Sequence, residues 1–232
     1  MDTSTFHVEQ PLVPRSASIF EELLRGESLE LFGLEGHLKL SYMDTYWDTA
    51  GGDLHAAALL LRTRSRRGHT DFLDFKGPPR YLMGTLFARP FWSEKVLDKT
   101  DAESAIQLRR PSTTMQALYT QRPDLIGRRL FSVADAEVSR VNVNVVDGGE
   151  PVCVVSLHTY QFQIEASDQP PHQLIEVQPY SYVNATPDTL IKAMSSVLPL
   201  LEKKGFQRSP TSKYHRIPRA TLETALAALR QD

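Results

Sequence analysis

The sequence predicts an α+β fold in which a closed antiparallel β-barrel forms a tunnel with a polar interior and helices packed on its outside. Several segments alternate between apolar and polar residues, as strands with two different faces do. Their polar positions carry a selective mixture of Arg, His, Glu, Asn and Lys, for example at Arg62 and Arg64 and at Glu176 and Gln178. In an ordinary sandwich this face would meet bulk water and would be richer in Lys, Glu, Thr and Ser. We therefore expect the polar side chains to line the interior of a barrel.

The first third of the chain is expected to form strands and one short helix. Residues 6–13 alternate, and Pro11 ends this strand or places it at an edge. A helix capped by a serine continues to about Arg25. A turn at Gly51 and Gly52 interrupts the extended segments that follow. These further strands are predicted over residues 38–43, 44–49, 56–64, 70–76 and 90–97.

Three cations are predicted to share one volume among these strands. Side chains alternate faces along a strand, so Arg62 and Arg64 point the same way, and Lys76 shares a face with Asp74 on the next strand. Half-burying three cations without an anion would cost several kcal/mol. Guanidinium groups bind phosphate oxygens in pairs and an ammonium group adds a point charge, so phosphate is the expected partner.

The second half of the chain adds a helical insertion and further strands. The insertion is expected around residues 98–122. Residues 137–146 and 152–164 alternate cleanly and are joined by a turn at 147–150. A strand over residues 173–178, a helix over 187–204 and a C-terminal helix around 218–231 complete one domain that spans residues 1–232.

Composition excludes several classes of protein. The charges nearly balance at a formal net charge of −2, so we do not expect the overall charge of the protein to attract nucleic acid. A single cysteine, Cys153, excludes an internal disulfide and any multi-cysteine metal site. The N-terminus lacks a signal-like segment, and no segment holds the roughly eighteen apolar residues that a membrane span needs. We therefore expect a soluble, cytoplasmic protein without a membrane or nucleic-acid partner, and the sequence leaves its oligomeric state open, a homodimer included.

Six short motifs follow one another along nearly the whole chain. They are His7-x-Glu9-x-Pro11, Tyr46-Trp47-Asp48-Thr49, Leu61-Arg62-Thr63-Arg64, Phe75-Lys76-Gly77-Pro78, Glu176-x-Gln178 and Ser212-Lys213-Tyr214. No single motif is specific, but their order resembles that of the CYTH, or triphosphate tunnel metalloenzyme, superfamily, and in particular its thiamine triphosphatase-like members. The resemblance implies a tunnel enzyme that binds the phosphate chain of a small phosphate ester or anhydride.

The resemblance also assigns roles to individual residues. It implies that the phosphate chain is held by Arg62, Arg64, Lys76, Arg140 and Lys213. It implies a divalent metal ion, Mg or Mn, on Glu9, Glu176, His7, His158 and Glu94. It implies catalytic roles for Glu9, Glu176 and Lys76.

The acidic half of the family pattern is only partly present. His7 stands where the family has a first carboxylate, and His158 stands where it has a late aspartate. Pro11 and Gln178 replace a lysine and a second carboxylate. Magnesium prefers carboxylate oxygens, so two histidines and two glutamates would suit a softer metal such as manganese or zinc.

Three functions follow as hypotheses. The first is hydrolysis of a phosphoanhydride bond in a triphosphate compound. The second is ionisation and cyclisation of a prenyl diphosphate, the reaction of a terpene cyclase-type lyase, with a carbocation shielded in the tunnel by Leu60, Trp92, Tyr160 and Phe162. The third is a non-catalytic protein that binds a phosphate ligand.

Overall fold

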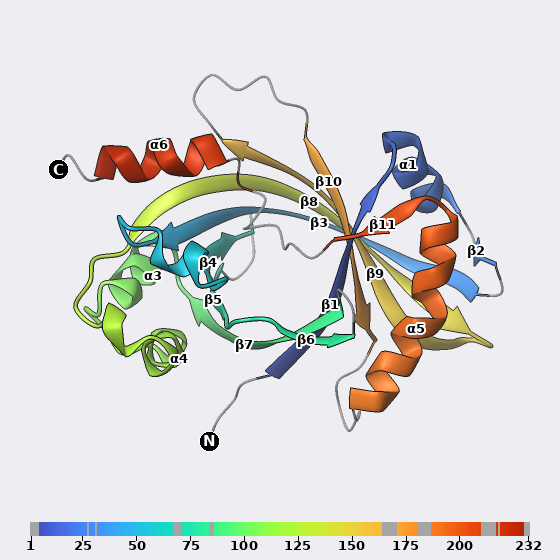
Figure 1. Ribbon diagram of the computed structural model, residues 1–232, viewed down its shortest axis with the longest axis horizontal. Coiled ribbons are helices and arrows are strands. Elements are labelled where there is room, and N and C mark those ends of the chain that lie inside the picture. The colour runs from blue at the N-terminus through green and yellow to red at the C-terminus, as the bar shows by residue number, and fades with distance from the viewer. Residues whose placement is uncertain are drawn as a thin grey trace.

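Eleven strands form one sheet in the computed structural model, with antiparallel pairing throughout the described residues (Figure 1). The structure describes residues 5–26, 28–30, 32–66, 71–83, 86–163, 171–180, 187–209, 217 and 219–229. The first elements are β1 (Thr5–Pro14), α1 (Ala17–Arg25), β2 (Ser28–Leu29), β3 (Phe32–Asp48), α2 (Asp53–Ala56), β4 (Leu60–Ser65), β5 (Asp71–Lys76), β6 (Arg80–Met83) and β7 (Leu86–Val96). The next are α3 (Lys99–Ile106), α4 (Thr113–Gln121), the short 3-10 helix η1 (Pro123–Leu125), β8 (Phe131–Asp147), β9 (Glu150–Gln163), β10 (His172–Pro179), α5 (Pro187–Lys203), β11 (Phe206–Arg208) and α6 (Arg219–Leu229).

Eight of these strands close into a barrel. Their order is β1, β10, β9, β8, β3, β4, β5 and β7, and β7 returns to β1. The closing pair joins residues 5–9 of β1 to residues 87–91 of β7. The long strands β3 and β8 pair along most of their length and curve side by side around one side of the barrel (Figure 1). The predicted closed antiparallel barrel is therefore confirmed.

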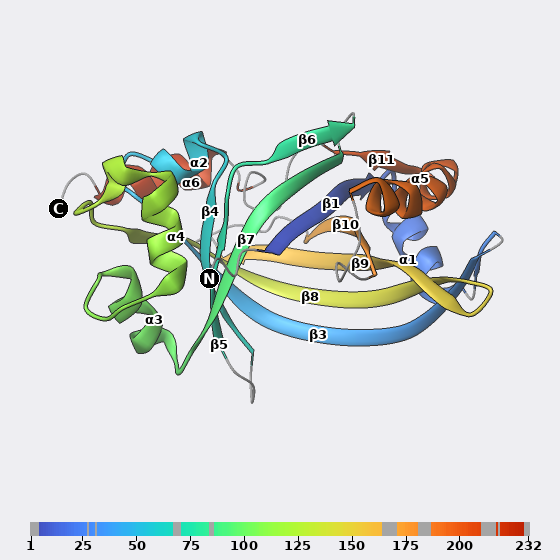
Figure 2. The same ribbon diagram turned by 90° about the horizontal axis from the view of Figure 1, so that it is seen from below.

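Helices cover the apolar outer face of the barrel on two opposite sides (Figure 2). On one side α1 and α5 pack against β1, β9 and β10 through a cluster that includes Leu23, Met194 and Leu198. On the other side α3 and α4 pack against β4, β5 and β7 through a cluster that includes Phe75 and Leu118. Helices thus occupy the predicted insertion and lie outside the barrel. None of the helices in the described part of the chain combines the length and the apolar content that crossing a lipid bilayer requires.

The barrel interior has an apolar half and a polar half. Tyr46, Leu60 and Tyr160 each lie two residues from a polar interior residue on the same strand, so their side chains also point inward. They pack together in a third apolar cluster. Leu222 and Leu226 of α6 belong to the same cluster, as does Ile217, which precedes the helix, so the C-terminal helix covers this half of the interior. The polar half contains the predicted cations and forms the candidate site.

The segment before β4 differs from the strand predicted over residues 56–64. The carboxylate of Asp48 accepts hydrogen bonds from the backbone amides of Leu54 and His55, at 2.8 and 2.9 Å, and holds the first turn of α2. The strand β4 therefore begins only at Leu60. The short strands β2, β6 and β11 carry no alternating pattern long enough to predict them.

Candidate active site

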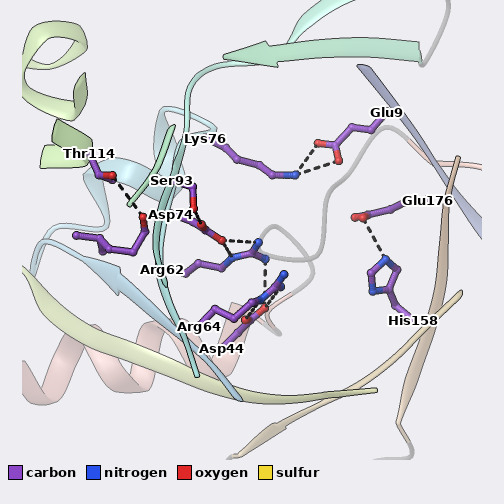
Figure 3. A network of polar contacts seen from close by, with 11 residues as sticks. Glu9, Asp44, Arg62, Arg64, Asp74, Lys76, Ser93, Thr114, His158 and Glu176 are labelled. Atoms are coloured by element: carbon purple, nitrogen blue, oxygen red, sulfur yellow. Dashed lines mark hydrogen bonds and ion pairs between the residues drawn. The ribbon is translucent and has the colours of Figure 1, made fainter. Parts of the chain in front are cut away.

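A cavity of about 280 Å³ occupies the polar half of the barrel. Figure 3 shows the polar contacts around it from close by. Side chains from β1, β4, β5, β7, β8 and β10 line the cavity, namely His7, Arg62, Arg64, Phe72, Asp74, Lys76, Phe91, Ser93, Arg140, Glu176 and Gln178. Four cations and two carboxylates therefore face a single cavity, which is partly open to solvent.

Arg62, on β4, donates more hydrogen bonds to carboxylates than the other cations in this cavity. Its Nε and Nη2 atoms donate to Oδ2 of Asp74 at 2.9 and 2.8 Å, and its Nη1 donates to Oδ2 of Asp44 at 3.2 Å. Ser93 donates its hydroxyl hydrogen to the other oxygen of Asp74 at 2.7 Å. Burial lowers the pKa of Arg62, but the Asp44 and Asp74 carboxylates outweigh burial and leave the pKa above its ordinary value. Arg62 is therefore a fixed, fully charged cation.

Arg64 shares the carboxylate of Asp44. Its Nε and Nη2 atoms donate to the two oxygens of Asp44 at 2.7 and 2.8 Å, which is a bidentate ion pair. Its guanidinium carbon lies 3.7 Å from the ring centre of Tyr42, so a cation–π contact holds the other side of the group. Burial and the neighbouring Arg62 lower the pKa of Arg64, but Asp44 reverses this and the pKa is raised overall. The fully buried Asp44 thus orients both arginines.

Lys76, on β5, is held by Glu9 of β1. Its Nζ atom donates to both carboxylate oxygens of Glu9, at 3.2 and 3.1 Å. Glu9 is 1% exposed and does not line the cavity, whereas Lys76 does. Figure 3 shows the side chain of Glu9 directed at the ammonium group of Lys76. The pair therefore fixes an ammonium group at the cavity wall.

Glu176 and His158 form a second buried pair, on β10 and β9. The Nε2 atom of His158 lies 3.1 Å from Oε2 of Glu176. Glu176 lines the cavity, while His158 is fully buried behind it. The histidine therefore orients the carboxylate from the side that faces the barrel wall.

Arg140, on β8, has neutral partners. Its Nε donates to the amide oxygen of Asn142, and its Nη2 donates to the hydroxyl oxygen of Ser156 at 2.7 Å. Ser156 in turn donates to the same Asn142 oxygen at 3.0 Å. Within the part of the chain that the structure describes, no carboxylate contacts Arg140. Its positive charge is therefore not neutralised by a described acidic residue.

His7 lies in the cavity wall and is uncharged near neutral pH. Burial lowers the pKa of His7 to about 4, and the ammonium group of Lys76 contributes in the same direction. The imidazole ring lies against Phe91 with the ring centres 4.2 Å apart. His7 therefore adds a polar, neutral surface to the cavity.

The structure brings most of the predicted site residues together. The cavity is lined by Arg62, Arg64, Lys76, Arg140, His7 and Glu176, and directly behind it lie Glu9 and His158. Lys213 lies outside the described residues. The shared volume predicted for the three cations of β4 and β5 is confirmed, and the chemical roles of all these residues remain predictions.

Two residues named from the sequence lie outside the barrel. The carboxylate of Glu94 accepts hydrogen bonds from Nη1 of Arg110 at 3.3 Å and from the backbone amide of Thr114 at 3.2 Å, at the start of α4. Trp92 stacks on Phe75, with ring centres 5.3 Å apart, in the outer cluster under the helical insertion. Neither side chain lines the cavity. Glu94 is therefore not part of a metal set with Glu9, and Trp92 does not shield a ligand in the tunnel.

Several polar residues of the site were not singled out from the sequence. Asp44 has the strand parity of Tyr42 and Tyr46, so extending the face pattern along its strand would have placed it inside. Asn142 and Ser156 occur in alternating segments without any motif around them. Only the register of β8 against β9, in which these two residues are directly opposite, shows that they meet.

The arrangement of these residues does not fit a resident metal ion. Both oxygens of Glu9 accept from Lys76, and Glu176 is bonded to His158. Among the residues that the structure describes, no three His, Cys, Asp or Glu side chains gather closely enough to hold a metal ion.

Comparison with known proteins identifies the fold. No protein-family model matches the sequence, and no curated protein matches it. Among solved structures, HpAC1 of Hippeastrum, a proposed adenylyl cyclase with a dominant triphosphatase activity, is similar with a TM-score of 0.63 and 18% identity over 94% of this chain and 95% of that chain. A proposed adenylate cyclase of Bacillus halodurans gives a TM-score of 0.58 and 16% identity over 92% of this chain and 98% of that chain.

A third structure extends the comparison. The PH1819 protein of Pyrococcus horikoshii gives a TM-score of 0.54 and 18% identity over 90% of this chain and 96% of that chain. At such identities the similarity establishes the fold. The chain shares the fold of these three structures, and the closed antiparallel barrel that the resemblance implied is confirmed.

Proposed function

We propose that this chain hydrolyses a phosphoanhydride bond of a small triphosphate compound in its tunnel. The observation that carries the proposal is the cavity inside the barrel that Arg62, Arg64, Lys76 and Arg140 line together. Cations fixed on strands inside a closed wall can bind a phosphate chain and stabilise the charge that develops on its oxygens. The dominant triphosphatase activity of HpAC1, a protein of the same fold, supports this choice of reaction.

The size of the cavity favours a phosphate chain as the part of the substrate that enters. About 280 Å³ is slightly below the roughly 300–1,000 Å³ that is usual for sites of drug-sized ligands. Most of the lining residues are charged or polar. We therefore expect the phosphate groups to fill the cavity and any bulky organic group to remain at its mouth.

The carboxylate of Glu176 is the group that we assign to proton transfer from the attacking water. It lines the cavity, and His158 holds it from behind at 3.1 Å. A general base must lie within hydrogen-bond reach of the proton that it removes, and of the two glutamates expected to be catalytic only Glu176 lines the cavity. Glu9 instead positions Lys76, whose ammonium group then contacts a phosphate oxygen.

Phosphate release tests this proposal. Tripolyphosphate, thiamine triphosphate and nucleoside triphosphates are each offered with magnesium, with manganese and with a chelator. We expect release from at least one of them, reduced about a hundredfold or more by Arg140→Ala because a cation that stabilises the transition state is lost. Arg110→Ala is the matched control, because Arg110 pairs with Glu94 and Asp101 outside the barrel. Absence of release from every substrate under every condition contradicts the proposal.

The apolar half of the interior favours a second candidate, ionisation and cyclisation of a prenyl diphosphate. Three of the four residues named for this reaction, Leu60, Tyr160 and Phe162, belong to the interior cluster, on the same strands as polar site residues. Incubation with geranyl and farnesyl diphosphates, followed by gas chromatography, tests it. Cyclic products support this candidate, and a blank trace contradicts it. Binding of tripolyphosphate with neither reaction would identify a non-catalytic phosphate binder.

A further inference from the structure

Asp74 places a negative charge in the wall of a cavity that is proposed to hold an anion. It lines the cavity beside Lys76, and it is 3% exposed. Its Oδ2 atom accepts two hydrogen bonds from one guanidinium group, that of Arg62. Its Oδ1 atom accepts the hydroxyl hydrogen of Ser93. Every hydrogen bond of this carboxylate therefore belongs to a residue of the cavity wall.

The arginines of the cavity differ in the donors that they have left for a ligand. A guanidinium group carries five N–H bonds, and the edge formed by Nε and Nη2 suits two oxygens of one anion. On Arg62 this edge is occupied by Asp74, and Nη1 donates to Asp44. Arg140 uses the same Nε and Nη2 edge for the neutral oxygens of Asn142 and Ser156, but both N–H bonds of its Nη1 atom remain available. A phosphate can therefore bind Arg140 directly, whereas it can bind the favoured edge of Arg62 only after Asp74 has left.

We propose that Asp74 competes with the bound phosphate chain for Arg62 and thereby sets the affinity and selectivity of the tunnel for polyphosphates. The inference rests on the proposed phosphate-binding function of the cavity. In the absence of ligand the carboxylate occupies the position of a phosphate group on the guanidinium edge. A chain anchored at Arg140 then displaces Asp74, and an anion too short to reach both arginines gains nothing from Arg62.

The contacts of Asp74 allow this exchange without leaving a buried charge unpaired. Arg62 keeps its ion pair with Asp44 when Asp74 departs. Asp74 keeps its hydrogen bond from the hydroxyl of Ser93. Because Ser93 is exposed, this bond holds the released carboxylate at the more open part of the cavity wall. Asp44 is not suited to such a role, because it is fully buried and bridges two arginines.

Removal of the competing charge gives the first test. We expect Asp74→Asn to bind inorganic tripolyphosphate about tenfold more tightly than the wild-type chain in isothermal titration calorimetry. A neutral amide binds the guanidinium group of Arg62 more weakly than a carboxylate does, so the phosphate chain displaces it more easily. The matched control is Asp101→Asn, since Asp101 accepts hydrogen bonds from Arg110 in a similar manner outside the barrel. This control is expected to bind as the wild type does.

Two further variants separate displacement from a general effect of charge. Ser93→Ala keeps the charge of Asp74 but removes the hydroxyl that the released carboxylate retains. Displacement then leaves the carboxylate without this partner, so we expect a loss in affinity of a few-fold. In an Arg62→Ala background, Asp74→Asn is expected to give no further gain, because the group for which Asp74 competes is absent. Circular dichroism and thermal unfolding establish that each variant is folded, and Ser93→Ala decides the matter should Asp74→Asn not fold.

The outcomes also distinguish this inference from the proposed function. Equal affinity of the wild-type chain, Asp74→Asn and Ser93→Ala overturns the competition and leaves the phosphate site intact. A gain that persists in the Arg62→Ala background overturns it as well, because the effect would then arise from charge alone. Failure of all chains to bind tripolyphosphate overturns both the inference and the proposed function.

Discussion

Each cation in the tunnel has a different set of partners, and these partners decide what it can do. Arg62 is paired with two aspartates, Lys76 is paired with Glu9, and Arg140 meets only an amide and a hydroxyl. A group of buried cations was expected to need phosphate as its counter-charge. The structure shows that the protein supplies most of this counter-charge itself, so the cations alone do not identify the ligand.

At the residue scale, the loss of Asp44 should destabilise the protein strongly. Asp44 pairs with both Arg62 and Arg64 and is fully buried, so Asp44→Ala leaves the charge of Arg64 without its carboxylate. We expect a loss of about 3 kcal/mol in the free energy of unfolding, measured in urea. The comparable change Asp124→Ala, at an exposed pair with Arg122, should have little effect. Equal midpoints for the two variants would contradict the structural role of Asp44.

His7 should make stability depend on pH. Its folded pKa is about 4, whereas an unfolded histidine titrates near 6.5. Between these values the unfolded chain binds the proton and the folded chain does not, so the free energy of unfolding falls as the pH is lowered from 6.5 towards 4. The slope from this group is at most about 1.4 kcal/mol per pH unit. Urea unfolding of wild-type and His7→Gln chains at several pH values measures this slope. If the free energies of unfolding of the two chains depend on pH in the same way, the prediction is contradicted.

The sequence predicts the site unevenly at this scale. Strand parity alone places Arg62 and Arg64 on one face, because that pattern is local. The partners of these residues come from distant strands, such as Asp44 from β3 and Glu9 from β1, and their positions depend on the register between strands. Register is not visible in a short motif, so the acidic residues that pair with the cations could not be assigned.

At the scale of elements, Asp48 ends one strand and begins the next helix. Its buried carboxylate accepts hydrogen bonds from the backbone amides of Thr49, Leu54 and His55. We expect Asp48→Ala to lower the free energy of unfolding by about 1–3 kcal/mol, because buried amides lose their acceptor. Asp48→Asn should cost less because it keeps one oxygen. Thermal unfolding checks the order of the two variants, and equal losses would contradict it.

The turn between β3 and α2 lies against α6 and limits how closely the helix can approach. Gly52 has a φ of 73°, and a Cβ at this position would lie 3.0 Å from Cδ1 of Leu226 on α6. Gly52→Ala should therefore combine backbone strain with crowding of the helix.

A second glycine separates these two costs. Gly127 has a φ of 80° and no heavy atom within 4 Å of a Cβ, so Gly127→Ala should show the backbone cost alone, about 1 kcal/mol. We expect Gly52→Ala to lower the free energy of unfolding by more than this in urea. A smaller loss at Gly52 would show that Leu226 moves aside without cost.

At the scale of the molecule, the barrel could be predicted because its strands repeat one pattern. Alternation with polar residues of an unusual kind indicated an enclosed polar face. The strand β9 lies close to its predicted range, whereas β8 begins six residues before the strand predicted over residues 137–146. The division of the interior into a polar and an apolar half could not be predicted. It depends on residues such as Tyr46 and Tyr160, which share strand parity with polar side chains and differ from them only in their position along the barrel.

The closure of the barrel by β1 has a consequence for the order of events during protein synthesis. β1 pairs with β7, with β10 and with β11, and Gln10 lies opposite Val177. Ribosomes add about 5–20 residues per second, so on the order of ten to thirty seconds pass between the synthesis of β1 and that of its partner β10. Until then its edge is unpaired and open to other chains. Completion of the tunnel must therefore await the synthesis of β10, and until then the nascent chain is exposed to misassembly through the strand that carries His7 and Glu9.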